Sequence, residues 1–232
     1  MIRGRGLYRG MFRGMSPKSY KAAAGSYLFQ ETFEAAGYDN AGWTESVAAG
    51  GTVDEDDTTA TVLAGSQQLK IYGALASVDI SYTNSSDFTA SGNLYVRFLF
   101  KIKNTLPIAS SIVIYLNAAG SAAKQWVSLE TTGTLKVSVG AKSATTTATI
   151  AVNTKYWVWV TYLKGTGANQ TGRIAFSSDG ATEPTSDNGT TQGYNQFTDG
   201  ARTDDLNSIR LGMKGEREVY FDQLLVSASS IT

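Results

Sequence analysis

Residues 94–103 constrain the fold of this chain most, because their side chains alternate in character. Large apolar residues fill every even position from Leu94 to Ile102, whereas Arg97, Lys101 and Lys103 stand at odd positions beside Tyr95 and Leu99. Successive side chains of a β-strand point to opposite faces of a sheet. The period of two therefore predicts a strand with one buried face.

Short β-like runs continue through the chain from Tyr27 onward. They are separated by Gly, Ser, Asn, Asp and Thr, at the spacing expected of a β-sandwich. No part of residues 27–232 has convincing helical periodicity. Besides 94–103, strands are predicted at 27–34, 59–63, 68–72, 78–82, 112–117, 126–130, 135–139, 147–152, 156–164, 173–177, 208–213 and 218–227.

The length and composition fit one folded domain. A chain of 232 residues can form one sizeable β domain with an adequate core. Hydrophobic residues make up 42% of the chain and charged residues 17%, which argues against a largely disordered protein. We therefore predict an all-β fold at residues 27–232, a two-sheet antiparallel β-sandwich (jelly roll), preceded by an extended basic N-terminal arm at residues 1–26.

The arm differs from the rest of the chain in charge. Six basic residues precede Glu31, the first acidic residue, and only 14 of the 20 basic residues remain to balance 20 acidic ones. Its first part repeats with a period of four, Gly-Leu-Tyr-Arg at 6–9 and Gly-Met-Phe-Arg at 10–13. One glycine per helical turn costs about 1 kcal/mol relative to alanine. An extended or flexible arm is therefore predicted, with residues 16–26 as a linker.

We expect the arm to dock onto a neighbouring protein. Its apolar residues are too sparse to pack on one another, so they would become ordered against a partner. Arg-Gly steps with aromatic residues also bind nucleic acid, but we rank this alternative lower, and an arm without a specific role also stays open. The predicted partner-binding residues are Arg3, Arg5, Leu7, Tyr8, Arg9, Met11, Phe12 and Arg13.

The sequence contains neither cysteine nor histidine. The absence of cysteine excludes disulfides, thiolate metal sites and cysteine nucleophiles. The absence of histidine excludes Ser-His-Asp triads, His-ligated zinc and the most common general base near neutral pH. No window approaches the roughly 18 continuous apolar residues of a membrane span, so no membrane partner is expected.

Residues 27–227 resemble the concanavalin A-like lectin/glucanase and laminin-G-like jelly rolls. The resemblance lies in hydrophobic patterns with a few fixed polar residues, and it implies two curved antiparallel sheets that face each other. This fold hosts glycosidases, lyases, lectins, adhesion modules and virion proteins, so activity depends on the site. The matching segments are Phe29 to Glu34 with Gly37, Gly42 and Trp43, Gln68 to Ile71, Leu94 to Ile102, Trp157 to Val160, and Val219 to Ser227.

The acidic residues do not match the catalytic patterns of related enzymes. Glycosidases of this fold resemble one another in an alternating Glu-x-Asp-x-Glu strand, which is missing here. The acidic run 54–57 is continuous and is interpreted as a solvated turn, with a cation site as the alternative. The resemblance also implies that lyases of this fold use a histidine with a tyrosine. We therefore predict that the chain is not an enzyme.

A structural calcium ion is the inorganic ligand that the resemblance implies, near the first and last strands. Glu34, Asp39 and Asp222 stand at the matching positions. By strand alternation Asp222 shares a face with Tyr220 and Leu224, and a buried carboxylate needs a cation or several hydrogen-bond donors. A metal-free, hydrogen-bonded Asp222 remains the alternative.

Carbohydrate binding would use exposed aromatic rings. Trp157 and Trp159 lie on one face of a predicted strand, and such a pair more often fills a core than forms a sugar platform, which leaves Trp126 as the freer candidate. Residues 178–203 read as a long polar loop whose large apolar residues are Tyr194 and Phe197. Long loops are often functional, although these two residues could merely pin the loop to the sandwich.

These features together favour an attachment protein. The first hypothesis is a non-catalytic virion structural protein of a tailed bacteriophage, a decoration, head-fibre or tail-associated subunit located in the virion. Its arm would bind other virion proteins, its loops would contact host-surface glycans, and it would form a homo-oligomer or symmetric assembly. The alternative is a carbohydrate-binding or adhesion module, and a degraded glycosidase-like enzyme ranks third.

Overall fold

The computed structural model describes residues 27–34, 38, 42–58, 62–73, 78–83, 92–118, 123–189, 191–198 and 200–231. Residues 1–26, with all the predicted partner-binding residues of the arm, lie outside the described residues, and so does Asp39 of the predicted calcium set. The described part of the chain contains strands, turns and loops but no helix. Within it, therefore, no helix could cross a membrane.

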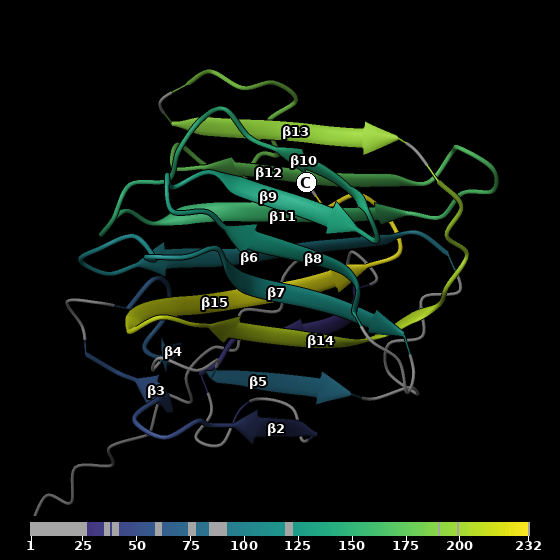
Figure 1. Ribbon diagram of the computed structural model, residues 1–232. Helices are drawn as coiled ribbons and strands as arrows, with labels where there is room; N and C mark the ends of the chain where they lie inside the picture. The colour runs from purple at the N-terminus through teal and green to yellow at the C-terminus, as the bar shows by residue number, and fades with distance from the viewer. Residues whose placement is uncertain are drawn as a thin grey trace, which may run out of the picture.

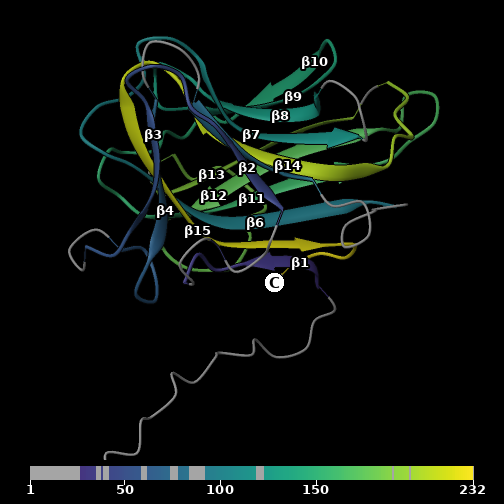
Figure 2. The same cartoon turned by 90° about the horizontal axis from the view of Figure 1, so that it is seen from below.

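The described strands form two antiparallel sheets that pack as two layers of a sandwich (Figures 1 and 2). This arrangement confirms the predicted all-β, two-sheet fold. The strands of sheet A are β1 (Tyr27–Glu31), β3 (Thr52–Asp56), β4 (Gln68–Gly73), β6 (Leu94–Ile102), β11 (Tyr156–Leu163), β12 (Thr171–Ser177), β13 (Gln192–Thr198) and β15 (Arg217–Ser227). Their order is β13-β12-β11-β6-β15-β4-β3, and β1 also pairs with β15.

Sheet B forms the second layer. Its strands are β2 (Trp43–Ser46), β5 (Val78–Thr83), β7 (Ser111–Ala118), β8 (Ala123–Leu129), β9 (Leu135–Val139), β10 (Lys142–Thr145) and β14 (Leu206–Met213). Their order is β10-β9-β8-β7-β14-β5-β2. Neighbouring strands of this sheet are often far apart in sequence, so its surface combines residues from distant parts of the chain.

The core between the layers is centred on β6, which lies between β11 and β15. Phe98 and Phe100, at the predicted inward positions, are at most 1% exposed. Their ring centroids lie 5.8 and 5.4 Å from that of Phe221 on β15. Truncating such a buried ring to alanine costs roughly 3–5 kcal/mol, so this aromatic group is a major source of the stability of the sandwich.

The prediction that Trp157 and Trp159 fill the sandwich core is wrong. Tyr156 and Val158 of the same strand face the core, so the two tryptophans face the outer side of sheet A. Trp159 is nevertheless 2% exposed. Because β11 is buried on both faces over most of its length, its sequence lacks the alternation that would have assigned the faces. Trp157 belongs to a second small cluster with Leu63, Ala64, Leu99 and Tyr220.

The polar segment 178–203 is not one long loop, because it contains β13 at the edge of sheet A. Gly193 of this strand lies so close to β12 that a Cβ atom there would overlap the Phe176 ring. Before the strand, Asp187 accepts hydrogen bonds from the backbone N–H groups of Thr147 and Ala148, at 2.8 and 3.1 Å. Glycine and polar residues gave this edge strand a loop-like composition.

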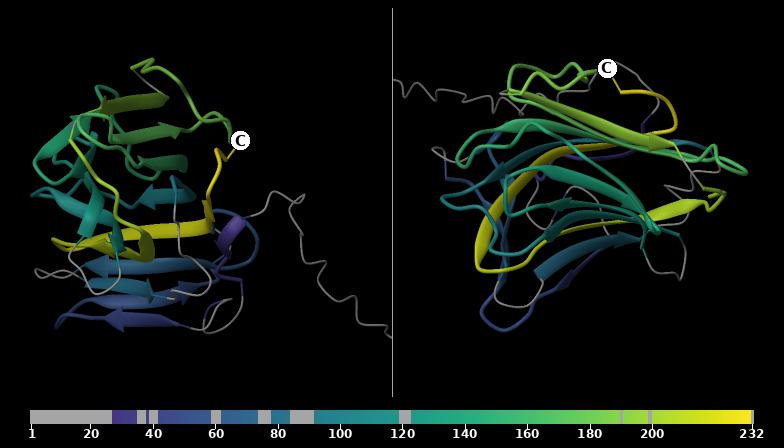
Figure 3. Two further views of the ribbon diagram at one scale, coloured as in Figure 1. Left: turned by 90° about the vertical axis from the view of Figure 1, so that its right-hand side faces the viewer. Right: turned by 45° about the horizontal axis from the view of Figure 1, so that its top comes forward.

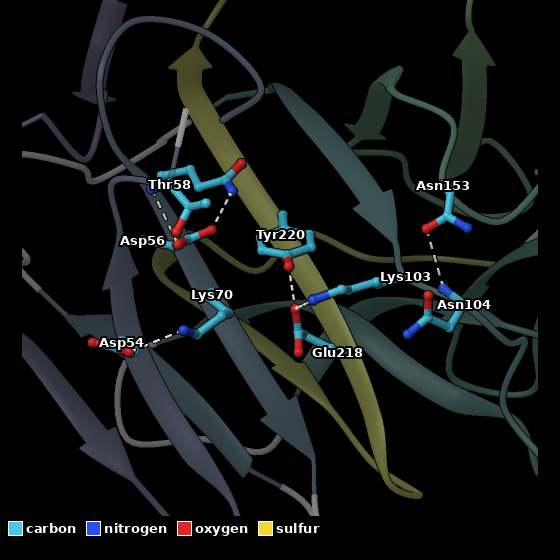
Figure 4. Close-up of polar contacts among 10 residues, drawn as sticks. Asp54, Asp56, Thr58, Lys70, Lys103, Asn104, Asn153, Glu218 and Tyr220 are labelled. Atoms are coloured by element: carbon cyan, nitrogen blue, oxygen red, sulfur yellow. Dashed lines mark hydrogen bonds and ion pairs between the residues drawn. The ribbon is translucent and has the colours of Figure 1, made fainter. Parts of the chain in front are cut away.

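The acidic run 54–57 is not a solvated turn either. Asp54 and Asp56 lie on β3, where register pairs them with residues of β4. Asp54 forms an ion pair with Lys70 at 3.0 Å, and Asp56 accepts a hydrogen bond from Gln68 Nε2 at 2.9 Å (Figure 4). Partners on the neighbouring strand therefore hold an acidic sequence in an extended conformation.

The end of the chain lies on the outer side of sheet A. After β15 the chain runs away from sheet B (Figures 2 and 3), and Ile231 is only 4% exposed. The second small cluster, which contains Tyr220 and Trp157, also lies on this side. Part of the outer face of sheet A is thus buried, whereas hollows lie on the outer face of sheet B.

Candidate functional site

Two hollows lie side by side on the outer face of sheet B. One, of about 390 Å³, is lined mainly by β8, β9 and β10, and the other, of about 220 Å³, is lined by β5, β7 and β14. Ser110 and Ile112 line both hollows. We call the combined surface the trough. It runs across the strands from β10 to β5, over five inter-strand spacings, or roughly 24 Å.

A row of register partners forms the middle of the trough. Arg210 on β14 pairs with Tyr115 on β7, Tyr115 pairs with Trp126 on β8, and Trp126 pairs with Ser138 on β9. Most of the residues before and after them, such as Leu116 and Val127, belong to the core. Because side chains alternate along each strand, the row lies on the outer side of sheet B.

Electrostatic contacts fix the β14 end of this row. The guanidinium carbon of Arg210 lies 3.9 Å from the ring centroid of Tyr115, a cation–π contact. On its other side, Arg210 Nε lies 3.7 Å from a carboxylate oxygen of Asp79 on β5. The guanidinium is therefore held between a ring and a carboxylate.

The β9 end of the trough has a different polar set. Glu130 accepts hydrogen bonds from the hydroxyl groups of Ser110 and Ser128, at 2.9 and 2.7 Å. Lys136 and Lys142 line the same hollow. This end combines a fixed carboxylate, two ammonium groups and several hydroxyl groups, which suits a hydroxyl-rich ligand.

The structure separates the three predicted ligand-contact residues. Trp126 is partly exposed in the trough, as expected of a freer tryptophan. Tyr194 and Phe197 lie on β13 in sheet A, and Phe197 packs against the core. The hydroxyl group of Tyr194 donates a hydrogen bond to Gln196 at 2.9 Å. The three residues therefore do not share one loop, and a common contact with one ligand stays a prediction.

The two described members of the predicted calcium set are occupied by hydrogen-bond donors. Asp222 is 0% exposed, and its two oxygens accept bonds from the backbone N–H groups of Ala64 and Gln223, at 2.8 and 2.7 Å. Glu34 accepts bonds from the backbone N–H and the hydroxyl group of Ser66. No group of three or more acidic residues suited to a metal occurs among the described residues. Calcium binding stays a prediction.

Sequence reasoning missed Asp79, Tyr115 and Arg210. Each stands in a predicted strand, and Tyr115 and Arg210 each have apolar, core-facing residues on both sides. That pattern marks an outward position but says nothing about which strands are neighbours. The three residues meet only because β5, β14 and β7 are adjacent in sheet B.

Solved structures share this fold. An endo-β-1,4-glucuronan lyase from the fungus Trichoderma reesei superposes with a TM-score of 0.62 at 16% identity, over 88% of this chain and 96% of that chain. The PL-14 alginate lyase from Aplysia kurodai gives 0.59 at 8% identity, over 87% and 99%. The receptor-binding domain of botulinum neurotoxin type G gives 0.53 at 12%, over 89% and 48%. No family model matches the sequence, and no curated protein matches it.

These neighbours are jelly-roll β-sandwiches of the lectin and lyase kinds, which is the fold that the sequence resemblance implied. They contradict the prediction that the chain is not an enzyme, because two of them are polysaccharide lyases. That prediction relied on the absence of histidine. Tyrosine also serves as a general acid or base, and Tyr115 lines the trough. Identities of 8–16% establish a common fold alone.

Proposed function

We propose that the chain binds an acidic polysaccharide along the trough and cleaves it by β-elimination. The row of Arg210, Tyr115 and Trp126 carries this proposal, because it places a guanidinium, a phenol and an indole side by side on three neighbouring strands. Structural likeness to lyases that act on glucuronan and alginate supports the same reaction class.

The charge and the length of the trough favour an anionic polysaccharide as the ligand. The two hollows are lined by four cationic residues, Lys136, Lys142, Arg210 and Lys214, and by two acidic ones. A guanidinium can bind a carboxylate through two parallel hydrogen bonds. The trough is several times longer than one sugar ring, so several linked residues can lie across the strands.

The residues at the β14 end suit the chemistry of elimination. In a uronate, neutralising the carboxylate makes the hydrogen on the adjacent C5 more acidic. A base then removes that proton, the bond from C4 to the glycosidic oxygen breaks, a C4–C5 double bond forms, and the departing oxygen takes up a proton. We assign carboxylate neutralisation to Arg210 and proton transfer to Tyr115, and we assign stacking of a sugar ring to Trp126.

The proposal is tested with oligomers of β-1,4-linked glucuronic acid and cello-oligosaccharides of equal length, which differ in the carboxylate at C6. Calorimetry should detect binding of the acidic series alone, and ultraviolet absorbance should report the unsaturated product. Arg210→Gln should abolish both signals. Equal affinity for the two series, or wild-type binding by the Arg210→Gln variant, would overturn the proposal.

The neighbour that is a receptor-binding domain supports a second candidate, a module that holds glycans and does not cleave them. The two candidates share the trough and differ in the absorbance assay. The virion location, the docking of the arm and the symmetric assembly stay predictions from the sequence, and particle composition measured by mass spectrometry tests them.

A further inference from the structure

We propose that Asp79 is a positioning residue, which acts with Gly212 to hold the Arg210 guanidinium in the orientation that binds a sugar carboxylate. The inference rests on the proposed function and deepens it, because it names the residues that set the preference for acidic over neutral sugars. Asp79 would not contact the sugar. Its effect would pass through the guanidinium.

The contact between Asp79 and Arg210 runs diagonally across two strands. Register pairs Asp79 with Gly212 and Arg210 with Ser81, so the carboxylate reaches the guanidinium past the glycine rather than from directly opposite. A Cβ atom at Gly212 would lie 3.1 Å from the Cβ of Asp79 and 3.1 Å from the carbonyl oxygen of Val78. A larger residue at position 212 would therefore crowd Asp79, and glycine leaves room for the Asp79 side chain to reach Arg210.

Burial makes this carboxylate an effective support. Asp79 is only 8% exposed, and a carboxylate removed from water is stabilised by a nearby cation. The guanidinium of Arg210 is restrained by Asp79 on one side and by the Tyr115 ring on the other. A side chain that is restrained before binding loses less entropy when the ligand arrives.

The guanidinium keeps donors for a ligand. Among the described residues, Asp79 is the one polar partner of the Arg210 side chain, and 3.7 Å is an ion-pair distance rather than a hydrogen-bond distance. A ligand carboxylate can therefore accept hydrogen bonds from Arg210 while Asp79 stays in place. Asp79 thus positions the guanidinium without using up its hydrogen-bond donors.

Removal of the Asp79 charge separates positioning from simple charge attraction. Asp79→Asn makes the trough one charge more positive, so attraction alone predicts tighter binding of a glucuronic acid oligomer. Positioning predicts the opposite, a loss of about five- to tenfold, because the guanidinium is no longer restrained. Gly212→Ser changes no charge and should weaken binding in the same direction, whereas Gly180→Ser, whose site has no neighbour within 4 Å, should have no effect.

A spectrum of the free protein supplies a readout that needs no sugar. The Nε–H signal of Arg210, assigned by its loss in Arg210→Lys, should be displaced by the ring current of Tyr115 and should move toward its free-arginine position in Asp79→Asn. Melting temperatures would confirm that each variant is folded. Tighter or unchanged binding by Asp79→Asn, with Arg210→Gln inactive, overturns the positioning role alone; wild-type binding by Arg210→Gln overturns the proposed function itself.

Discussion

Tyr115 and Arg210 are register partners on adjacent strands, and the guanidinium of Arg210 lies against the Tyr115 ring at 3.9 Å. Both side chains are attached to hydrogen-bonded strands of a sheet, so their relative position does not depend on a mobile loop. A site built on such elements is held more exactly than one built on loops. The chemistry proposed for the trough therefore depends on groups that are in place before a ligand binds.

Replacing Trp126 by alanine should weaken binding of glucuronic acid oligomers without unfolding the protein. Trp126 is a partly exposed residue of the trough, and an aromatic contact contributes roughly 0.5–1.5 kcal/mol. Calorimetry should show a loss of about two- to thirteenfold. Trp157→Ala is the matched control, because Trp157 is also partly exposed but lies on the outer face of sheet A. An equal loss in both variants would remove Trp126 from the site.

Tyr115→Phe should separate binding from cleavage. The variant keeps the ring beneath Arg210 and removes the hydroxyl group, so affinity for the acidic oligomers should change less than twofold. The absorbance signal of the unsaturated product should fall at least a hundredfold, within the range for loss of a general acid or base. Cleavage at the wild-type rate would transfer proton removal to another group.

Glu218 should make stability depend on pH in the acid range. Burial alone would raise the pKa of Glu218, but hydrogen bonds from Lys103, at 2.8 Å, and from Tyr220 outweigh burial and leave the pKa below its usual value (Figure 4). The unfolded chain then takes up the proton first, so the stabilisation is present above about pH 4.5 and is lost as the pH falls through the folded-state pKa.

Urea unfolding of wild type and Glu218→Gln measures this contribution. Because the Glu218 side chain is 25% exposed, solvent screening limits the difference in unfolding free energy near pH 7 to about 1 kcal/mol or less. The difference should shrink between about pH 5 and pH 3. A difference that stays constant over that range would show that the charge of Glu218 does not contribute.

Gly193→Ala should destabilise the fold, because the new methyl group would overlap the ring of Phe176. Overpacking of this kind costs about 1–3 kcal/mol, and the cost would appear as a lower melting temperature. Gly180→Ala provides the control, since a Cβ atom there meets nothing within 4 Å. Equal melting temperatures for the two variants would mean that β13 does not pack on β12 as described.

Chelation tests the predicted calcium ion. If Asp222 holds calcium, EDTA lowers the melting temperature of the wild type and leaves that of Asp222→Asn unchanged. If hydrogen-bond donors satisfy Asp222 without a metal, EDTA has no effect, and Asp222→Asn loses about 1–3 kcal/mol because one buried donor loses its acceptor. The second result would end the calcium prediction.

The sequence was sufficient to predict the fold class, because a strand with one solvent-exposed face shows a clear alternation of apolar and polar residues. β6 was predicted to within one residue for that reason. The faces of β11 could not be assigned, because apolar residues such as Trp159 pack on its outer side as well. β13 was missed because its short, polar, glycine-containing sequence depends on the neighbouring strand for its conformation.

The site was less accessible to sequence reasoning than the fold. Trp126 could be named from its residue type, since an indole outside the core suggests a ligand contact. Asp79, Tyr115 and Arg210 are separated by 36 and 95 positions in the chain, and only strand order brings them together. Strand order follows from long-range packing rather than from local pattern, which is why the trough became visible only in the folded chain.

The position of the bound sugar tests the central claim most directly. Backbone amide shifts recorded during titration with a glucuronic acid oligomer should change along β7, β8 and β14 and in the Trp126 indole, while β11, β12 and β13 stay unchanged. Changes confined to the outer face of sheet A, or no changes at ligand concentrations that saturate binding in calorimetry, would contradict the assignment of the trough as the polysaccharide site.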